Sequence, residues 1–233
     1  MLIGGVHRFS LIDYPEKTAC VVFSQGCNLR CPYCHNPELI KMDSLRQRVL
    51  EKAFFDFLIS RQGKLDAVVI TGGEPCLQSD LEDFIAKIKE LDFLVKLDTN
   101  GTNAEVLERL LAKHLLNYIA MDIKAPLMRY EEVTGVNFTK AKIKQIQHSI
   151  ELVLTSPIPY EFRTTVVAGL LTSNDVLAIG DLIRQARLYV LQRFHPAKTY
   201  QPEFATSSSF SEEEFQQLTK ALKAKGIHEV LVR

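Results

Sequence analysis

Short runs of β-branched and apolar residues alternate along this chain with longer amphipathic runs, and this alternation limits its possible folds more than any other feature. Seven short runs have the composition of strands: residues 19–24, 67–71, 94–98, 118–123, 162–167, 190–194 and 229–232. Longer runs with helical spacing of apolar residues lie between them: 44–60, 80–90, 104–113, 140–154, 174–187 and 212–225. This order predicts an α/β fold with a mostly parallel sheet covered by helices.

The number of strand–helix units favours a particular member of this class. About six units fit a partial (β/α)6 barrel of the TIM type better than a complete eightfold barrel. The 233 residues suit one α/β domain, and no repeat or long linker interrupts them. We therefore expect a single domain over residues 1–233, with 197–233 forming a C-terminal helix–strand extension. Residues 197–209 should be its loosest part.

Helix starts carry a second local signal. A hydroxyl side chain followed three residues later by glutamate predicts a capping box, which satisfies two backbone amides at a helix N-terminus. Ser79 with Glu82, Thr102 with Glu105, and Ser211 with Glu214 show this pattern.

Chemically unusual residues follow the predicted strands. They occur at 27–34, 72–75, 98–101, 122–124 and 193–195, and Arg163 lies within the fifth predicted strand. Because functional groups of parallel α/β folds gather at the C-terminal ends of strands, these segments together predict one site at that rim.

Composition excludes several function classes. Lysine plus arginine and aspartate plus glutamate both number 28, so no net charge attracts nucleic acid or an anionic membrane. No apolar stretch approaches the roughly 20 residues that span a bilayer. The first residues lack the pattern of a signal peptide. We expect a cytoplasmic protein with neither nucleic-acid nor membrane partners.

Three of the five cysteines lie in the octapeptide "CNLRCPYC", at Cys27, Cys31 and Cys34. An odd total with three clustered thiols argues against a disulfide framework and for metal binding or catalysis. A [4Fe–4S] cluster fits this spacing, since three thiolates on one loop can bind three irons. The fourth iron would then be open to a substrate, as the open position of catalytic zinc is.

Other interpretations of the cysteines stay open. Structural zinc needs four ligands, and a fourth could come from His35, Cys20 or Cys76. His35, however, adjoins Cys34, and Cys20 lies within a predicted strand, where a cysteine is usually part of the core. Cys76 is near the predicted rim, but a small apolar filler is its simpler role. Plain buried thiols are the third interpretation.

The cysteine spacing, with Tyr33 before the last thiol, resembles the signature of the radical S-adenosylmethionine (SAM) superfamily. The wider segment "SLIDYPEKTACVVFSQGCNLRCPYCHNPEL" is similar to the activating enzymes of glycyl-radical proteins, above all those of anaerobic ribonucleoside-triphosphate reductase. The resemblance extends over about residues 4–195. The chain lacks the glycine–glutamate pattern that many members carry on the fifth strand, since "VVAGLLTSND" matches it poorly.

This resemblance implies a radical SAM oxidoreductase. Its [4Fe–4S] cluster would reduce SAM to release a 5′-deoxyadenosyl radical, which abstracts hydrogen from a glycine of a partner glycyl-radical enzyme. A flavodoxin- or ferredoxin-type donor would supply the electron. Two alternatives stay open: a radical SAM enzyme acting on a small molecule, similar to 7-carboxy-7-deazaguanine synthase, and a non-enzymatic metal-binding module.

The resemblance also implies contacts between the motif "TGGEP" and the cofactor. Gly72, Gly73 and Glu74 would bind the amino group of SAM, and the backbone of Tyr33 would contact its adenine. Taken alone, "TGGEP" is equally compatible with a tight turn between a strand and a helix.

The motifs "DTNG" and "MDIKAP" would alone be a turn and a strand end. By resemblance they position the cofactor and bind a monovalent cation. Asp98, Thr99 and Asp122 would be the cation ligands. Asp98, Asn100 and Lys124 would bind the cofactor, with Lys124 near a carboxylate.

Two further residues complete the predicted site. Arg163 lies in an apolar strand, where a buried charge needs a partner, and this is either the cofactor carboxylate or an acid of the protein. His195, in "QRFHP", resembles a strand-end histidine that approaches SAM, although a structural histidine is the alternative.

Overall fold

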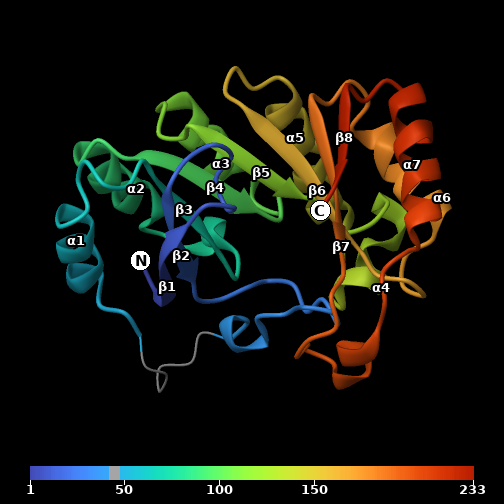
Figure 1. Ribbon diagram of the computed structural model, residues 1–233, viewed down its shortest axis with the longest axis horizontal. Coiled ribbons are helices and arrows are strands. Elements are labelled where there is room, and N and C mark those ends of the chain that lie inside the picture. Colours follow the sequence, from blue (N-terminus) through green and yellow to red (C-terminus); the bar gives the residue numbers. More distant parts are fainter. Residues whose placement is uncertain (42–47) are drawn as a thin grey trace. The chain divides into compact units, whose positions relative to one another are not determined.

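The computed structural model describes residues 1–41 and 48–233. Over these residues eight strands follow one another in sheet order from β1 to β8 (Figure 1). The strands are β1 (Ile3–Ser10), β2 (Ala19–Ser24), β3 (Ala67–Gly72), β4 (Leu94–Thr99), β5 (Tyr118–Asp122), β6 (Tyr160–Val166), β7 (Leu188–Arg193) and β8 (Glu229–Val232). The α-helices are α1 (Glu51–Ile59), α2 (Leu81–Glu90), α3 (Ala104–Ala112), α4 (Tyr130–Thr134), α5 (Lys140–Leu154), α6 (Ser173–Leu182) and α7 (Glu212–Ala224).

The chain divides into two compact units. Unit 1 comprises Met1–Asn28, Glu38–Thr99 and Glu105–Ile119, and unit 2 comprises Leu29–Pro37, Asn100–Ala104 and Ala120–Arg233. Unit 1 therefore contains β1 to β4, and unit 2 contains β6 to β8.

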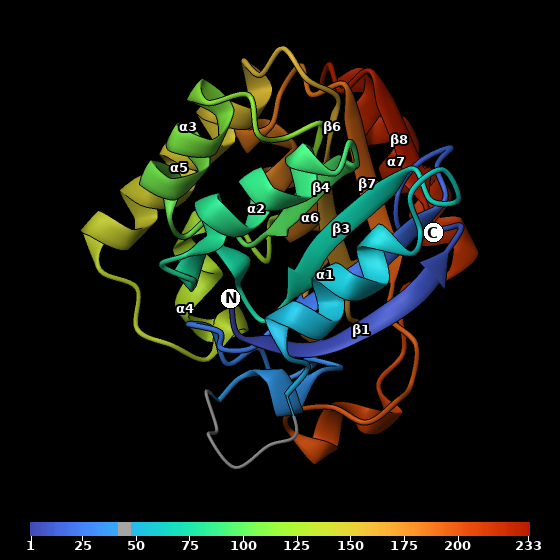
Figure 2. The same ribbon diagram turned by 90° about the vertical axis from the view of Figure 1, so that its left-hand side faces the viewer.

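In unit 1, β2, β3 and β4 pair in parallel, and β1 runs antiparallel to β2. The first four residues of both β2 and β3 are buried, as expected for strands covered on both faces. Helices α1 and α2 lie on the same face of these strands (Figure 2). Phe54 of α1 stacks on Phe84 of α2 with ring centroids 5.4 Å apart, so aromatic packing joins the two helices.

In unit 2, β6, β7 and β8 pair in parallel. Helices α6 and α7 contact each other, and α7 also contacts β8 (Figure 1). The predicted capping box of Ser211 and Glu214 is confirmed at the start of α7. Another box, Thr172 with Asp175, caps α6.

The predicted α/β class with a mostly parallel sheet is confirmed, but several local predictions differ from the structure. Strand β1 was not predicted, and it is half exposed and begins "IGG" instead of with a β-branched run. The predicted helix 44–60 is observed from Glu51, and residues 44–47 of that prediction lie outside the described residues. The predicted cap at Ser79 is wrong, because Asp80 occupies the N-cap position of α2. None of the helices in the described ranges is long and apolar enough to cross a membrane.

The cap of α6 leads to a stability prediction. Burial alone would raise the pKa of Asp175, but hydrogen bonds from Thr172 and the charge of Arg129 outweigh it and lower the pKa. The ionised carboxylate therefore stabilises the fold above the ordinary pKa of 3.8, and this contribution is lost as the pH falls below that value. Asp175→Asn should cost about 1 kcal/mol at pH 7 and less near pH 3, where protonation begins to remove the charge, measured by urea unfolding. Glu108→Gln, at an exposed position of α3, is the control. An equal loss at both pH values would contradict the charge explanation.

Candidate functional site

The first part of the cysteine loop, in unit 1, has its backbone held on both sides. Gly26 N donates to Leu39 O at 2.7 Å, and Cys27 N donates to Ile40 O at 3.1 Å. Glu74 N donates to Gly26 O at 2.8 Å. These bonds join the backbone next to Cys27 to the "TGGEP" turn.

The two glycines of "TGGEP" allow this close approach. A Cβ on Gly73 would lie 2.1 Å from Gly26 O, and a Cβ on Gly72 would lie 2.5 Å from Ser24 N. Gly72 also has φ of +112°, a conformation that side chains disfavour. Glycine is therefore needed here because two backbone segments pack directly against each other.

Glu74 is buried, with 1% of its surface exposed. Its Oε1 accepts hydrogen bonds from Cys76 N at 3.1 Å and from the Thr99 hydroxyl at 2.7 Å. Cys76 Sγ lies 3.6 Å from the same hydroxyl. Burial first, and then the Glu74 carboxylate, raise the pKa of Cys76 well above its ordinary value. Glu74 thus connects the "TGGEP" turn to the end of β4, a role that the sequence did not indicate.

Asp98, a predicted cation ligand in unit 1, faces an ammonium group of the protein. Lys96 Nζ lies 3.2 Å from Asp98 Oδ1 and donates to Asp13 O at 2.6 Å. Lys96 is buried, and its ammonium lies 5.6 Å from the centroid of the Tyr118 ring. A positive charge is therefore already present beside this carboxylate.

In unit 2, the rest of the cysteine loop is held by segments distant in sequence. Arg30 N donates to Thr134 O at 2.8 Å, and Cys34 N donates to Cys31 O at 3.1 Å. A Cβ on Gly135 would lie 2.6 Å from Arg30 O, so the end of α4 packs closely against this loop.

The segment expected to be loose also holds this loop. Tyr200 N donates to Cys34 O at 3.0 Å, and Gln201 N donates to Pro32 O at 2.9 Å. Sequence reasoning missed these contacts because backbone donors leave no side-chain signal. Backbone hydrogen bonds within each unit hold the part of the loop that belongs to it, while the thiols are the groups suited to bind a metal.

Tyr33 is buried in the same loop. Its hydroxyl has no hydrogen-bond partner among the described residues, and burial raises its pKa well above the ordinary value. Lys124 and Asp122 are close enough to influence its charge. An unsatisfied buried hydroxyl is costly, which fits a site that gains a polar ligand.

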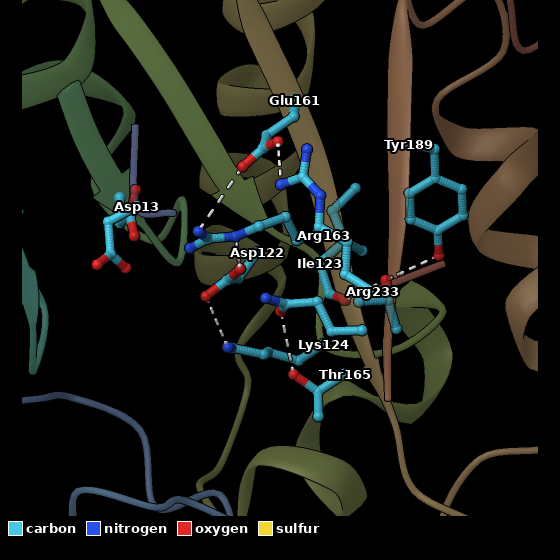
Figure 3. Close-up of polar contacts among 12 residues, drawn as sticks. Asp13, Asp122, Ile123, Lys124, Glu161, Arg163, Thr165, Tyr189 and Arg233 are labelled. Atoms are coloured by element: carbon cyan, nitrogen blue, oxygen red, sulfur yellow. Dashed lines mark hydrogen bonds and ion pairs between the residues drawn. The ribbon is translucent and has the colours of Figure 1, made fainter. Parts of the chain in front are cut away.

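Three predicted site residues meet in unit 2 (Figure 3). Arg163 Nε donates to Asp122 Oδ1 at 2.7 Å, and Lys124 Nζ donates to Asp122 Oδ2 at 3.0 Å. Burial would raise the pKa of Asp122, but Arg163 and Lys124 hold it well below its ordinary value. Burial would lower the pKa of Lys124, but Asp122 raises it well above the ordinary value. All three groups are therefore charged at neutral pH.

The remaining predicted residues have other surroundings. The Asn100 side chain accepts hydrogen bonds from Thr102 N at 3.0 Å and from its hydroxyl at 2.6 Å, so it shapes the turn after β4. His195 is exposed beyond the end of β7. His35 stacks on Phe194 with centroids 4.9 Å apart.

The cysteine sulfurs fit an iron–sulfur cluster better than a disulfide. All five cysteines lie in the described part of the chain, and none forms a disulfide bond. The loop is divided between the units, with Cys27 in unit 1 and Cys31 and Cys34 in unit 2. Within neither unit do the described residues gather three or more His, Cys, Asp or Glu side chains into a metal-binding group. The fit therefore rests on the chemistry of three thiols within one short, well-anchored loop.

Comparison with known families identifies the class of protein. The family model described as the radical SAM superfamily matches residues 21–179. The chain belongs to this superfamily, which implies a [4Fe–4S] cluster and SAM as cofactors.

Similarity to known proteins indicates which group within the superfamily the chain belongs to. The chain is 37% identical over 236 residues to the Methanocaldococcus jannaschii protein named "Putative glycyl-radical enzyme activating enzyme MJ1227", covering 100% of this chain and 95% of the relative. Within the superfamily it therefore belongs with the glycyl-radical enzyme activating enzymes. It is also 35% identical over 137 residues to the pyruvate formate-lyase-activating enzyme of Clostridium pasteurianum, covering 53% of this chain and 54% of the relative.

Solved structures agree with this fold. A radical SAM methyltransferase from Sphaerobacter thermophilus matches with a TM-score of 0.70 at 18% identity, covering 94% of this chain and 67% of that chain. A domain of a pyruvate-formate lyase-activating enzyme from Bacteroides vulgatus matches with a TM-score of 0.55 at 17% identity, covering 71% of this chain and 98% of that domain.

Proposed function

We propose that this protein installs a glycyl radical in an anaerobic ribonucleoside-triphosphate reductase. The observation that carries the proposal is the segment from Ser10 to Leu39, whose wider pattern around the cysteines resembles the activating proteins of that reductase. The match along the whole chain to a relative named as an activating enzyme supports the same activity.

Cys27, Cys31 and Cys34 would hold three irons of the cluster and leave the fourth to SAM. When bound, the cluster would supply the electron for reductive cleavage of SAM, and this chemistry would remove a hydrogen atom from a glycine of the partner. The chain itself needs to bind and orient SAM and to exclude water from the site. The backbone hydrogen bonds that anchor each part of the loop within its own unit support this demand.

The cofactor contacts form part of the proposal. Lys124 and Arg163 would face the SAM carboxylate, since both carry positive charge and are only partly exposed to solvent. Gly72, Gly73 and Glu74 would form the segment that receives the SAM amino group. The Glu74 side chain supports that segment through the bond to its own Cys76 amide.

The adenosine and strand-end contacts are proposed in the same way. Tyr33 would contact the adenine through its backbone, and Asn100 would act through the turn that it stabilises. Asp98 and His195 are proposed to lie near the bound cofactor.

A monovalent cation at Asp98, Thr99 and Asp122 is part of the proposal, and it would share the two carboxylates with Lys96 and Lys124, which pair with them. A flavodoxin- or ferredoxin-type donor and a cytoplasmic location complete the proposal.

The test mixes the reconstituted, reduced protein with SAM and an anaerobic ribonucleotide reductase under strictly anaerobic conditions. We expect a glycyl-radical doublet in the electron paramagnetic resonance spectrum. A reductase variant with alanine in place of its radical glycine should give no signal. Pyruvate formate-lyase is the comparison partner. A doublet with the lyase and none with the reductase would overturn the assignment of the partner, and SAM cleavage without any protein radical would overturn the proposed activity.

A further inference from the structure

A buried carboxylate that the sequence did not single out lies beside the charged group of unit 2. Glu161 on β6 is 1% exposed, and its Oε1 lies 3.9 Å from Arg163 Nη1. Its Oε2 accepts a hydrogen bond from Arg233 Nη1 at 3.2 Å. Glu161 and Arg163 are two residues apart on one strand, so their side chains share one face of the sheet. Figure 3 shows Glu161 between the two guanidinium groups.

These side chains form a row of alternating charges. In order they are Arg233, Glu161, Arg163, Asp122 and Lys124, and each is paired with the next. Burying a carboxylate such as Glu161 is costly without such partners. The buried members of the row therefore depend on their neighbours to compensate their charge.

Arg163 is held from two sides in this row. Its Nε bonds to Asp122, while its Nη1 faces Glu161. Because a guanidinium group is planar and rigid, contacts at two of its nitrogens determine its orientation. Asp122, held by Arg163, in turn determines the position of the Lys124 ammonium.

We propose that Glu161 is a positioning residue for SAM binding, acting through Arg163 on the Asp122–Lys124 pair, and that Arg233 holds Glu161 in place. This inference rests on the proposed function, in which Arg163 and Lys124 face the cofactor carboxylate. Glu161 itself touches no cofactor in this arrangement. Removing its charge lets the Arg163 guanidinium turn, which weakens cofactor binding and leaves the chemical step intact.

The test measures the Kd of SAM by equilibrium binding to the reconstituted holoenzyme. The iron content and Tm of the same samples are recorded, together with kcat and KM for SAM cleavage. Glu161→Gln should raise Kd and KM about tenfold and change kcat less than about twofold, because the buried Arg163 guanidinium loses the negative charge that it faces at 3.9 Å. No partner protein is present, so the result does not depend on which glycyl-radical enzyme is activated.

A second pair of variants tests the same row where folding is not at risk, since the Arg233 side chain is 45% exposed. Arg233→Gln should raise Kd about threefold, and Arg233→Lys should recover most of the lost affinity because it keeps the charge. Glu212→Gln removes an exposed partner of Arg193 and is the matched control, expected to bind SAM like the unaltered protein.

The outcomes separate a positioning role from a structural one. Lower Tm in Glu161→Gln and Arg233→Gln with an unchanged Kd would overturn the proposal and leave a structural ion pair. An equal effect of Arg233→Lys and Arg233→Gln would also overturn it. Failure of the protein to form a glycyl radical in any partner would overturn the proposed function without changing these Kd values.

Discussion

Replacing any one of Cys27, Cys31 and Cys34 by serine is expected to reduce SAM cleavage more than about 100-fold, because each thiolate would bind a separate iron. The iron content after anaerobic reconstitution should fall below about half of the value for the unaltered protein, with loss of the broad iron–sulfur absorbance. Both quantities are measured on the same samples, so low activity can be traced to cluster loss.

Cys20 is the matched control for these variants. It is fully buried within β2, and burial raises its pKa to about 12, which disfavours the thiolate that a metal needs. Cys20→Ala should keep its iron and cleave SAM. Full cluster content in a serine variant of any of the three loop cysteines would contradict the assignment of these cysteines as cluster ligands. Loss of the cluster in Cys20→Ala would instead indicate that Cys20 is a ligand.

Gly73→Ala is expected to have the next largest effect. Its Cβ would lie 2.1 Å from Gly26 O and 2.7 Å from Gly26 C, which are backbone atoms one residue before Cys27. The two backbones must separate, because neither contact can be relieved by rotating a side chain. We expect the KM for SAM to rise more than about tenfold and the free energy of unfolding to fall by about 2 kcal/mol.

Gly5→Ala provides the comparison in the same unit. The nearest atom to its new Cβ would be a Phe23 side-chain carbon at 3.9 Å, an ordinary van der Waals contact. Its KM should stay unchanged. If Gly73→Ala cleaved SAM with the KM of the unaltered protein, the close packing of the "TGGEP" turn against the cysteine loop would not be needed for SAM binding.

The accuracy of the sequence-based predictions varied with the kind of element. Apolar strands were predicted well because their runs leave few alternatives: the buried β2 and the less buried β8 both match their predicted bounds. Strand β1 was missed because it is partly exposed and contains two glycines, so it forms only by pairing with β2. The composition of a segment does not show which strand it will pair with.

Side-chain contacts divide in a similar way. The sequence placed Asp122 and Lys124 at a strand end and Arg163 within the next predicted strand, and the structure brings these three together. It assigned no role to Glu161, to Arg233 or to the backbone of Tyr200. Glu161 and Arg233 are 72 residues apart along the chain, so only folding makes them neighbours.

By itself, the sequence determined the α/β class, the three-thiol loop and membership of the radical SAM superfamily, because strand periodicity and the spacing of metal ligands are local properties. Only the tertiary structure decided how Glu74 pairs with Thr99, which segments hold the cysteine loop, and how Glu161 meets its two arginines. Hydrogen bonds and ion pairs depend on distances through space, and those distances exist only once the strands have paired and the polar groups have been buried.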